Sequence, residues 1–138
     1  MINGMEKLFN TVSIAVGVIG GAAVRLTGGF DVMFCALLVM IALDYISGII
    51  KAVHKRQLSS EIGFNGILRK ITILLVVAAA NIIQEAFGGE TAVREMVIMF
   101  YIANEGISLL ENVASVSGRI PEKLKDILFQ LRGGDENE

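Results

Sequence analysis

The sequence predicts an all-α integral membrane protein with about four transmembrane helices and a short C-terminal amphipathic helix. Hydrophobic residues make up 54% of the 138-residue chain, and 15 glycines come in addition. This apolar share exceeds that of an ordinary soluble domain. The charged residues, 19% of the chain, are also segregated, because residues 8–24, 32–43, 71–84 and 96–104 carry no charge. We therefore expect a single membrane domain over residues 1–138.

The first predicted span, about 8–24, is short for a membrane crossing, because 17 residues extend about 25 Å as a helix. A span of this length is expected to do one of three things: tilt little, thin the bilayer locally or insert only in part. Its basic start and apolar stretch are also those of a signal peptide, but three apolar segments follow, so we interpret it as a retained span. The other spans are predicted at about 32–50, 71–87 and 96–113. Gly28-Gly29 and Gly88-Gly89 provide the turns of the two hairpins.

Basic residues predict the orientation of these spans. Of the 12 Lys and Arg residues, only Arg25 and Arg94 lie on one side of the predicted membrane, and the others lie on the opposite side. Because Lys and Arg are enriched in cytoplasmic loops, both termini and a basic loop over residues 51–70 are predicted to be cytoplasmic. This loop is expected to contact anionic headgroups. Its basic residues are Lys51, Lys55, Arg56, Arg69 and Lys70.

Residues 114–138 form the predicted cytoplasmic tail. Pro121 suits the start of a helix, and we predict an amphipathic helix over 121–132. The acidic end GGDENE is expected to be disordered. The apolar face of the helix consists of Leu124, Ile127, Leu128 and Leu131.

Asp44 lies inside the second span, where an aspartate costs about 2.5–3.5 kcal/mol on insertion. Ten strongly apolar residues in 32–50 return roughly 3–6 kcal/mol, so the span still inserts. In the fourth span, the insertion cost of Glu105 is closer in size to the gain from the apolar residues. Three spans thus carry polar stripes, which either line a wet or subunit-facing surface or only join helices within one bundle. The candidate polar or assembly face consists of Asp44, Ser47, Gly48, Asn81, Glu85, Glu105, Ser108 and Asn112.

Small residues give a second candidate contact. Gly17 and Gly21 form a G-x-x-x-G pattern, which lets two helix backbones approach closely. The partner helix belongs either to the same chain or to another subunit.

The sequence argues against an enzyme. His54 and Cys35 are the only His and Cys residues and cannot build an ordinary zinc site. We find no phosphate loop, dinucleotide fingerprint or G-x-S-x-G motif, and expect neither a cofactor nor a nucleic-acid partner. An ion-selective channel would need a defined filter, and no segment suggests one.

Two blocks resemble the toxin-secretion/phage-lysis holin family. The block LDYISGIIKAVHKRQLSSEIGFNGILRK is similar to the family's central pattern, and ANEGISLLENVASVSGRIPEKLKDIL to its C-terminal signature. The matching positions of the first block are Asp44, Gly48, Lys51, Ser59, Ser60, Gly63, Gly66, Arg69 and Lys70. Those of the second are Glu105, Ser108, Glu111, Asn112, Gly118, Pro121 and Leu124.

The resemblance implies a holin in the cytoplasmic membrane of a bacterium late in phage infection. Such a protein forms homo-oligomeric lesions in the lipid bilayer that release an endolysin, or a toxin, without required direct contact. It catalyses nothing and needs no cofactor. The alternative is an antiholin-like or scaffolding small membrane protein, whose polar stripes serve only helix packing.

Overall fold

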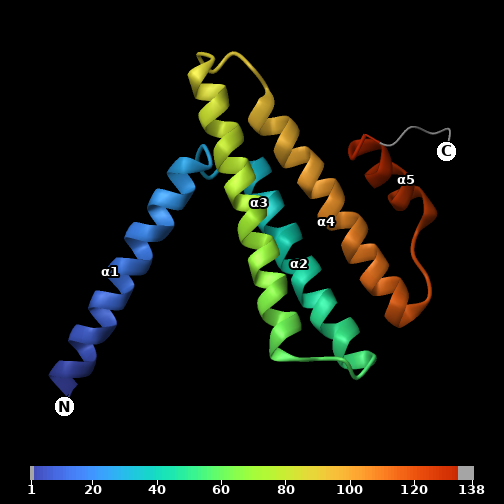
Figure 1. The fold of residues 1–138 in the computed structure, drawn as a ribbon, viewed down its shortest axis with the longest axis horizontal. Coiled ribbons are helices and arrows are strands. Elements are labelled where there is room, and N and C mark those ends of the chain that lie inside the picture. The colour runs from blue at the N-terminus through green and yellow to red at the C-terminus, as the bar shows by residue number, and fades with distance from the viewer. Residues whose placement is uncertain (1, 134–138) are drawn as a thin grey trace.

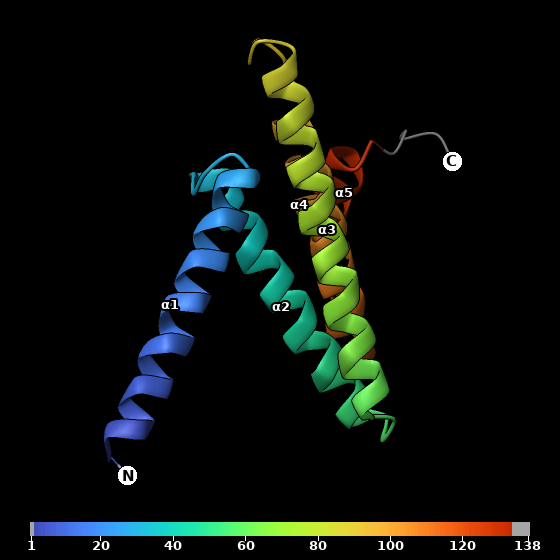
Figure 2. The same ribbon diagram turned by 60° about the vertical axis from the view of Figure 1, so that its left-hand side comes forward.

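The computed structural model describes residues 2–133, which form five α-helices and no strand. The all-α prediction is thereby confirmed. The helices α2, α3 and α4 lie side by side, α5 packs against α4, and α1 projects away from the others (Figures 1 and 2). Residues 134–138 of the acidic end, which is predicted to be disordered, lie outside the described residues. The helices are α1 (Ile2–Leu26), α2 (Val32–His54), α3 (Ser60–Ala86), α4 (Val93–Ser117) and α5 (Glu122–Leu131).

Three predicted spans fall inside one helix each, and the third, 71–87, ends one residue beyond α3, but the helices are longer than the apolar runs. α3 begins at Ser60, so residues 51–70 are mostly helical and only 55–59 connect α2 with α3. The reason is that a charge-free run marks only the part of a helix that suits lipid. Charged residues at its ends do not interrupt the backbone hydrogen bonds, which are satisfied within the helix itself.

The ends of the helices are set by local sequence. The Asp31 side chain caps α2 by accepting from the Phe34 backbone N–H at 2.8 Å, and Ser59 caps α3 by accepting from Ile62 N–H at 3.2 Å. Such caps satisfy backbone donors that the first turn leaves without partners. The predicted glycine turns are confirmed, because both glycine pairs have positive φ angles between 75° and 99°, a region that other residues rarely adopt.

An apolar core joins α2, α3 and α4. Its buried members are at most 6% exposed and are Phe34, Leu37, Ile73, Val77 and Ile98. In lipid such a core gains packing contacts but little hydrophobic driving force, because acyl chains are as apolar as leucine. Polar contacts between the helices are therefore expected to fix their orientation.

Three described helices are long and apolar enough to cross a membrane: α1, α2 and α3. α4 is 25 residues long but does not meet that criterion. This agrees with the sequence, in which the cost of inserting Glu105 nearly equals the gain from the apolar residues of the fourth span. The structure supports a helical membrane protein with three candidate spans, and a fourth crossing is a proposal.

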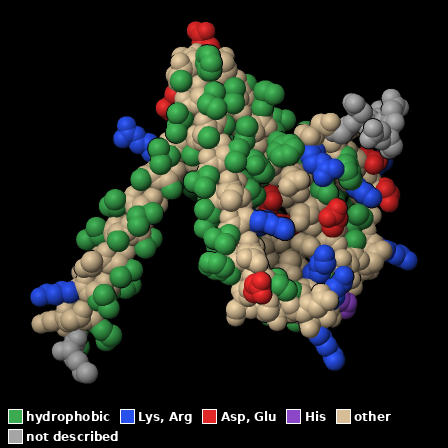
Figure 3. Space-filling view, viewed as in Figure 1, with side chains coloured by type: hydrophobic (Ala, Val, Ile, Leu, Met, Phe, Trp, Pro, Cys, Tyr) green, Lys and Arg blue, Asp and Glu red, His purple; other side chains and the backbone are tan. Residues whose placement is uncertain are grey.

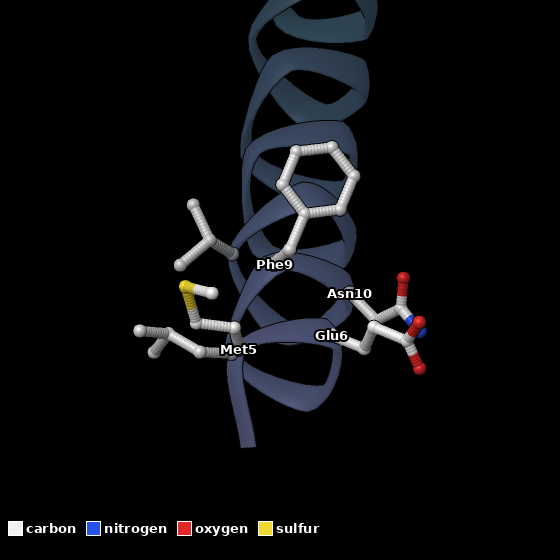
Figure 4. Close-up of a pocket in the computed structure, with 6 residues that line it drawn as sticks. Met5, Glu6, Phe9 and Asn10 are labelled. Carbon is white, nitrogen blue, oxygen red and sulfur yellow. The ribbon is translucent and has the colours of Figure 1, made fainter. Parts of the chain in front are cut away.

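α1 makes few contacts with the other helices of the described chain. None of its described residues is buried, and a Cβ placed at Gly17 or Gly21 would meet nothing within 4 Å. Figure 4 shows Met5 and Phe9 leaving this one helix beside Glu6 and Asn10, around a hollow lined only by α1 side chains. Packing of the G-x-x-x-G pattern within the described chain is thus excluded, and an intermolecular contact remains a proposal.

Candidate functional site

Hydrophobic side chains cover α1 and the upper part of the bundle in Figure 3, whereas charged ones gather around a hollow between α3 and α4. Lys70 of α3 lies between Asp44 of α2 and Glu105 of α4. The Lys70 ammonium donates hydrogen bonds to Asp44 Oδ2 and Glu105 Oε2. The three side chains are only 5–15% exposed. One cation therefore pairs with two buried carboxylates and connects three helices.

Asn112 of α4 extends this contact toward α2. Its Nδ2 donates to Asp44 Oδ1 at 3.1 Å and to Ser47 Oγ at 2.9 Å. The Ser47 hydroxyl in turn donates to the Asp44 carbonyl at 2.9 Å. Buried polar groups are tolerated when they are hydrogen-bonded, and this requirement is met here. We call Asp44, Ser47, Lys70, Glu105 and Asn112 the central cluster.

Two glycines bring α2 and α3 together beside the central cluster. The Tyr45 hydroxyl donates to the Gly63 carbonyl at 3.3 Å. A Cβ at Gly66 would lie 3.1 and 3.3 Å from ring carbons of Tyr45, closer than nearly all natural contacts. The spaced glycines of the central sequence block thus have a physical reason, because they leave room on α3 for the tyrosine ring.

A second polar cluster lies at the opposite end of the bundle, around Arg94. This side chain is 3% exposed. Its Nε donates to the Thr27 carbonyl at 2.5 Å, and its two terminal nitrogens donate to Asp31 at 2.6 and 3.3 Å and to the Gly29 carbonyl at 3.2 Å. These bonds attach the α1–α2 turn to α4. We call Thr27, Gly29, Asp31 and Arg94 the Arg94 clamp.

The Arg94 clamp has electrostatic and steric consequences. Hydrogen bonds from the Arg94 guanidinium hold the pKa of Asp31 below its ordinary value of 3.8. The turn also needs a glycine, because Gly28 has φ +92° and a Cβ there would lie 2.5 Å from Asn81 Oδ1. In the sequence, Arg94 is recognisable only as a charge on the sparsely basic side, and no pattern predicts its role in the clamp.

The structure divides the predicted polar face into two groups. Asn81 donates to the Leu26 carbonyl at 3.1 Å and to Glu85 at 3.2 Å, so both residues lie near the Arg94 clamp and not near Asp44. Within a single chain, Asn81 and Glu85 are thus separate from Asp44 and Glu105, and a shared assembly face of all eight residues stays a prediction. The others lie in or beside the central cluster, because Ser108 and Gly48 line the same cavity as Asp44 and Asn112.

Lys70 was placed by sequence in the basic loop, but it lies within α3 and turns toward the carboxylates. A signal for this was present, because Lys70 precedes the buried Ile73 and Val77 by three and seven residues and thus shares their helical face. Arg69 is exposed. Among residues 2–133, no group of three or more His, Cys, Asp or Glu side chains is arranged to hold a metal ion.

α5 covers the side of α4 next to the central cluster. Leu128 is 9% exposed and packs with Ile107 and Leu110. A Cβ at Gly106 would lie 3.0 Å from Leu128, so the glycine admits this contact. The predicted helix 121–132 is confirmed within a residue at each end. Only Leu128 of its predicted apolar face is buried, whereas Ile127 is 53% exposed.

Leu128→Ala is expected to loosen α5 from α4, because deleting a buried leucine side chain costs about 2–5 kcal/mol. Amide hydrogen exchange in α5, measured in detergent, should accelerate strongly. Ile127→Ala is the matched control, with the exposed neighbour shortened instead. Equal protection of α5 in both variants would contradict the packing.

Comparison with known proteins places these features in a family. A model of the bacteriophage holin family matches residues 21–133, which include α2–α5. The chain is 33% identical over 102 residues to a probable holin of Bacillus phage phi105, covering 74% of this chain and 76% of that protein. It is 40% identical over 131 residues to an uncharacterized protein of Listeria innocua, covering 92% and 94% of the two chains.

A Clostridium perfringens relative, described as an uncharacterized 14.9 kDa protein in the nagH 3' region, is 39% identical over 128 residues, which cover 92% of this chain and 97% of that one. No solved structure matches. The family match spans more than two thirds of the chain and includes both polar clusters. The chain therefore belongs to the bacteriophage holin family.

Proposed function

We propose that this protein is a holin that oligomerises in the bacterial cytoplasmic membrane and forms lesions. These lesions release an endolysin, or a toxin, without required direct contact with it. The family match over residues 21–133 carries the proposal, and the similarity to the probable holin of phage phi105 supports it. The three apolar helices fit a protein whose place of action is a bilayer.

The central cluster gives this proposal a physical mechanism. Within one chain, Asp44 and Glu105 are both paired with Lys70 and buried, so the protein accumulates in the membrane without exposing these charges to lipid. When subunits rearrange their helices, the same groups can line a wet surface, because polar intramembrane side chains are stable beside water or polar partners. The same pairing supports the proposed fourth crossing by α4, because Lys70 pairs with Glu105, whose charge makes insertion of α4 into lipid costly.

One observation favours the second candidate, an antiholin-like or scaffolding protein. The charges of the central cluster are paired inside a single chain, as expected of groups that only join helices. Inducible expression in a bacterial host distinguishes the two functions. A holin stops growth abruptly after a lag, and co-expressed endolysin then lyses the cells. Continued growth with the protein abundant in the membrane would support the second candidate instead.

Substitutions of Asp44 test whether the central cluster takes part in assembly. Asp44→Leu removes a carboxylate but leaves Lys70 paired with Glu105, so the variant should insert well yet assemble and trigger later. Asp44→Asn should be intermediate, because an amide retains hydrogen bonding to its neighbours. The readouts are membrane abundance, crosslinked oligomer size and lysis time. Normal abundance and wild-type lysis timing of Asp44→Leu would make Asp44 a bystander.

The proposed topology has both termini and the α2–α3 connection in the cytoplasm. Gln57, exposed within this connection, is a better probe than Ser59, whose side chain caps α3. With Cys35 replaced, Gln57→Cys should resist a membrane-impermeant thiol reagent in intact cells. Glu90→Cys, in the α3–α4 connection, should react readily as the matched control. Rapid labelling of Gln57→Cys would contradict the orientation.

A further inference from the structure

α5 doubles back along α4 and reaches the middle of the bundle. Leu128 is buried against α4, and a Cβ at Gly106 would lie 3.0 Å from Leu128 and 3.2 Å from Met40 of α2. Figure 1 shows α5 beside the middle of α4, running in the opposite direction. Gly106 lies about 16 Å from the end of α4 at Ser117. Leu128 therefore lies level with the centre of α4 and not beyond its end.

α4 in turn lies at the depth of the two candidate spans beside it. It packs against both α2 and α3, and Glu105, near its middle, shares Lys70 with Asp44 of α2. α2 and α3 are long and apolar enough to cross a membrane. The hydrocarbon core of a bilayer is about 30 Å thick, and the 25 residues of α4 extend about 37 Å. A bilayer crossed by α2 and α3 therefore places the centre of α4, and α5 with it, at hydrocarbon depth.

One flank of α5 is unsuited to lipid at that depth. Glu122, Lys123 and Asp126 are exposed charged residues on this short helix, and Asp126 lies within one turn of Leu128. Charged side chains within a membrane face a bundle interior, a partner or a water-filled cavity. Ile127 belongs to a different, apolar flank, because successive residues of a helix point about 100° apart. The polar flank of α5 therefore needs water or a polar partner.

The opposite side of the bundle is suited to lipid. Hydrophobic side chains cover α1 and the outer side of α3 in Figure 3, whereas charged side chains of both signs lie over α4 and α5. Residues 71–84 of α3 carry no charge, and Leu75 among them is 63% exposed. α4 is not one of the candidate spans, and Glu111 on it is exposed. The bundle thus has one side for lipid and another for water.

We propose that α5 and the outward side of α4 line the aqueous passage of the assembled lesion, with Glu122, Lys123 and Asp126 facing its water. The tail re-enters the membrane from the end at which α4 finishes and stays docked on α4. Several copies around a passage supply the water that the polar flank needs, while the outer side of α3 stays in lipid. This role of α5 rests on the proposed function and names the surface of the chain that borders the passage.

A reversible cross-link tests whether α5 acts from its docked position. The full chain with Cys35 replaced and with Gly106→Cys and Leu128→Cys is reconstituted into dye-loaded liposomes, and the two thiols are joined by a short reducible methanethiosulfonate reagent. The cross-linked protein should release as much dye as the same protein after reduction, because the passage requires no departure of α5. Dye release only after reduction would overturn the proposal, since α5 would then have to leave α4.

The matched control is Gly106→Cys with Ile127→Cys. Ile127 is 53% exposed, so this pair should not cross-link within one chain. The wild type separates the two proposals. Dye retention by the wild type contradicts the proposed function, whereas loss of release in the cross-linked form alone contradicts the role of α5 and leaves the function intact.

Nitroxide labels measure directly whether the polar flank of α5 borders water. The full chain is labelled at Asp126→Cys, with Cys35 replaced, in the same liposomes. This label should collide more often with an aqueous nickel chelate than with oxygen, which concentrates in lipid. Leu75→Cys, on the lipid side of α3, is the control and should show the reverse preference. A preference for oxygen at Asp126→Cys would overturn the proposal, even if the cross-linked protein releases dye.

Discussion

Lys70→Met is expected to cause the largest loss of stability of any single substitution in the bundle. The change removes the ammonium that lies between Asp44 and Glu105 and leaves two buried carboxylates without compensation. Breaking a buried ion pair by removing one partner typically costs about 3–5 kcal/mol. The free energy of unfolding in detergent micelles should fall by about this amount, and the protein should be less abundant in membranes.

The matched controls separate lost charge compensation from lost packing. Lys55→Met removes an exposed lysine between α2 and α3 and should leave stability nearly unchanged. The triple variant Lys70→Met, Asp44→Asn, Glu105→Gln keeps the shapes of the side chains but has no charge, so most of the stability should return. If Lys70→Met unfolds with the same free energy as Lys55→Met, the central cluster does not hold the three helices together.

Arg94→Gln should have the second largest effect, because it opens the Arg94 clamp. The buried Thr27 carbonyl and the partly buried Gly29 carbonyl lose their donors, and an unsatisfied buried acceptor costs about 1–3 kcal/mol. We expect a total loss of roughly 3 kcal/mol for two such groups. Arg94→Lys should rescue little, since an ammonium cannot reproduce the planar set of donors. Arg25→Gln, an exposed arginine near the same turn, is the control.

The Arg94 clamp also predicts a pH dependence. The pKa of Asp31 is lowered in the folded protein, chiefly by its hydrogen bonds from Arg94. The carboxylate therefore contributes stability above the unfolded value of 3.8, and this contribution is lost as the pH falls through the lower folded pKa. Unfolding measured between neutral pH and pH 3 should show this loss in the wild type. A slope of equal size in Arg94→Gln would contradict the assignment.

Several features follow from the sequence because they depend on neighbouring residues. The apolar runs predicted the positions of α1 to α4, and the two glycine pairs predicted turns that φ angles of 75–99° confirm. The C-terminal helix was also predicted within a residue at each end. Apolar composition, turn chemistry and helical periodicity act over a few residues, so the sequence contains them directly. The holin resemblance rested on residue spacing and is confirmed by the family match.

Tertiary structure decided which polar groups meet. Helical periodicity shows that Asn81 and Glu85 share one face of α3, but not the level at which that face meets α2 or α4. α3 begins well before its apolar run, so Lys70 reaches Asp44 and Glu105, whereas Asn81 lies a further eleven residues along, at the Arg94 clamp. The sequence by itself determined the helices, their turns and the presence of charges within them. Only the relative shift and rotation of the packed helices decided their partners, because an ion pair needs two atoms within a few ångströms and no single-helix pattern specifies that distance.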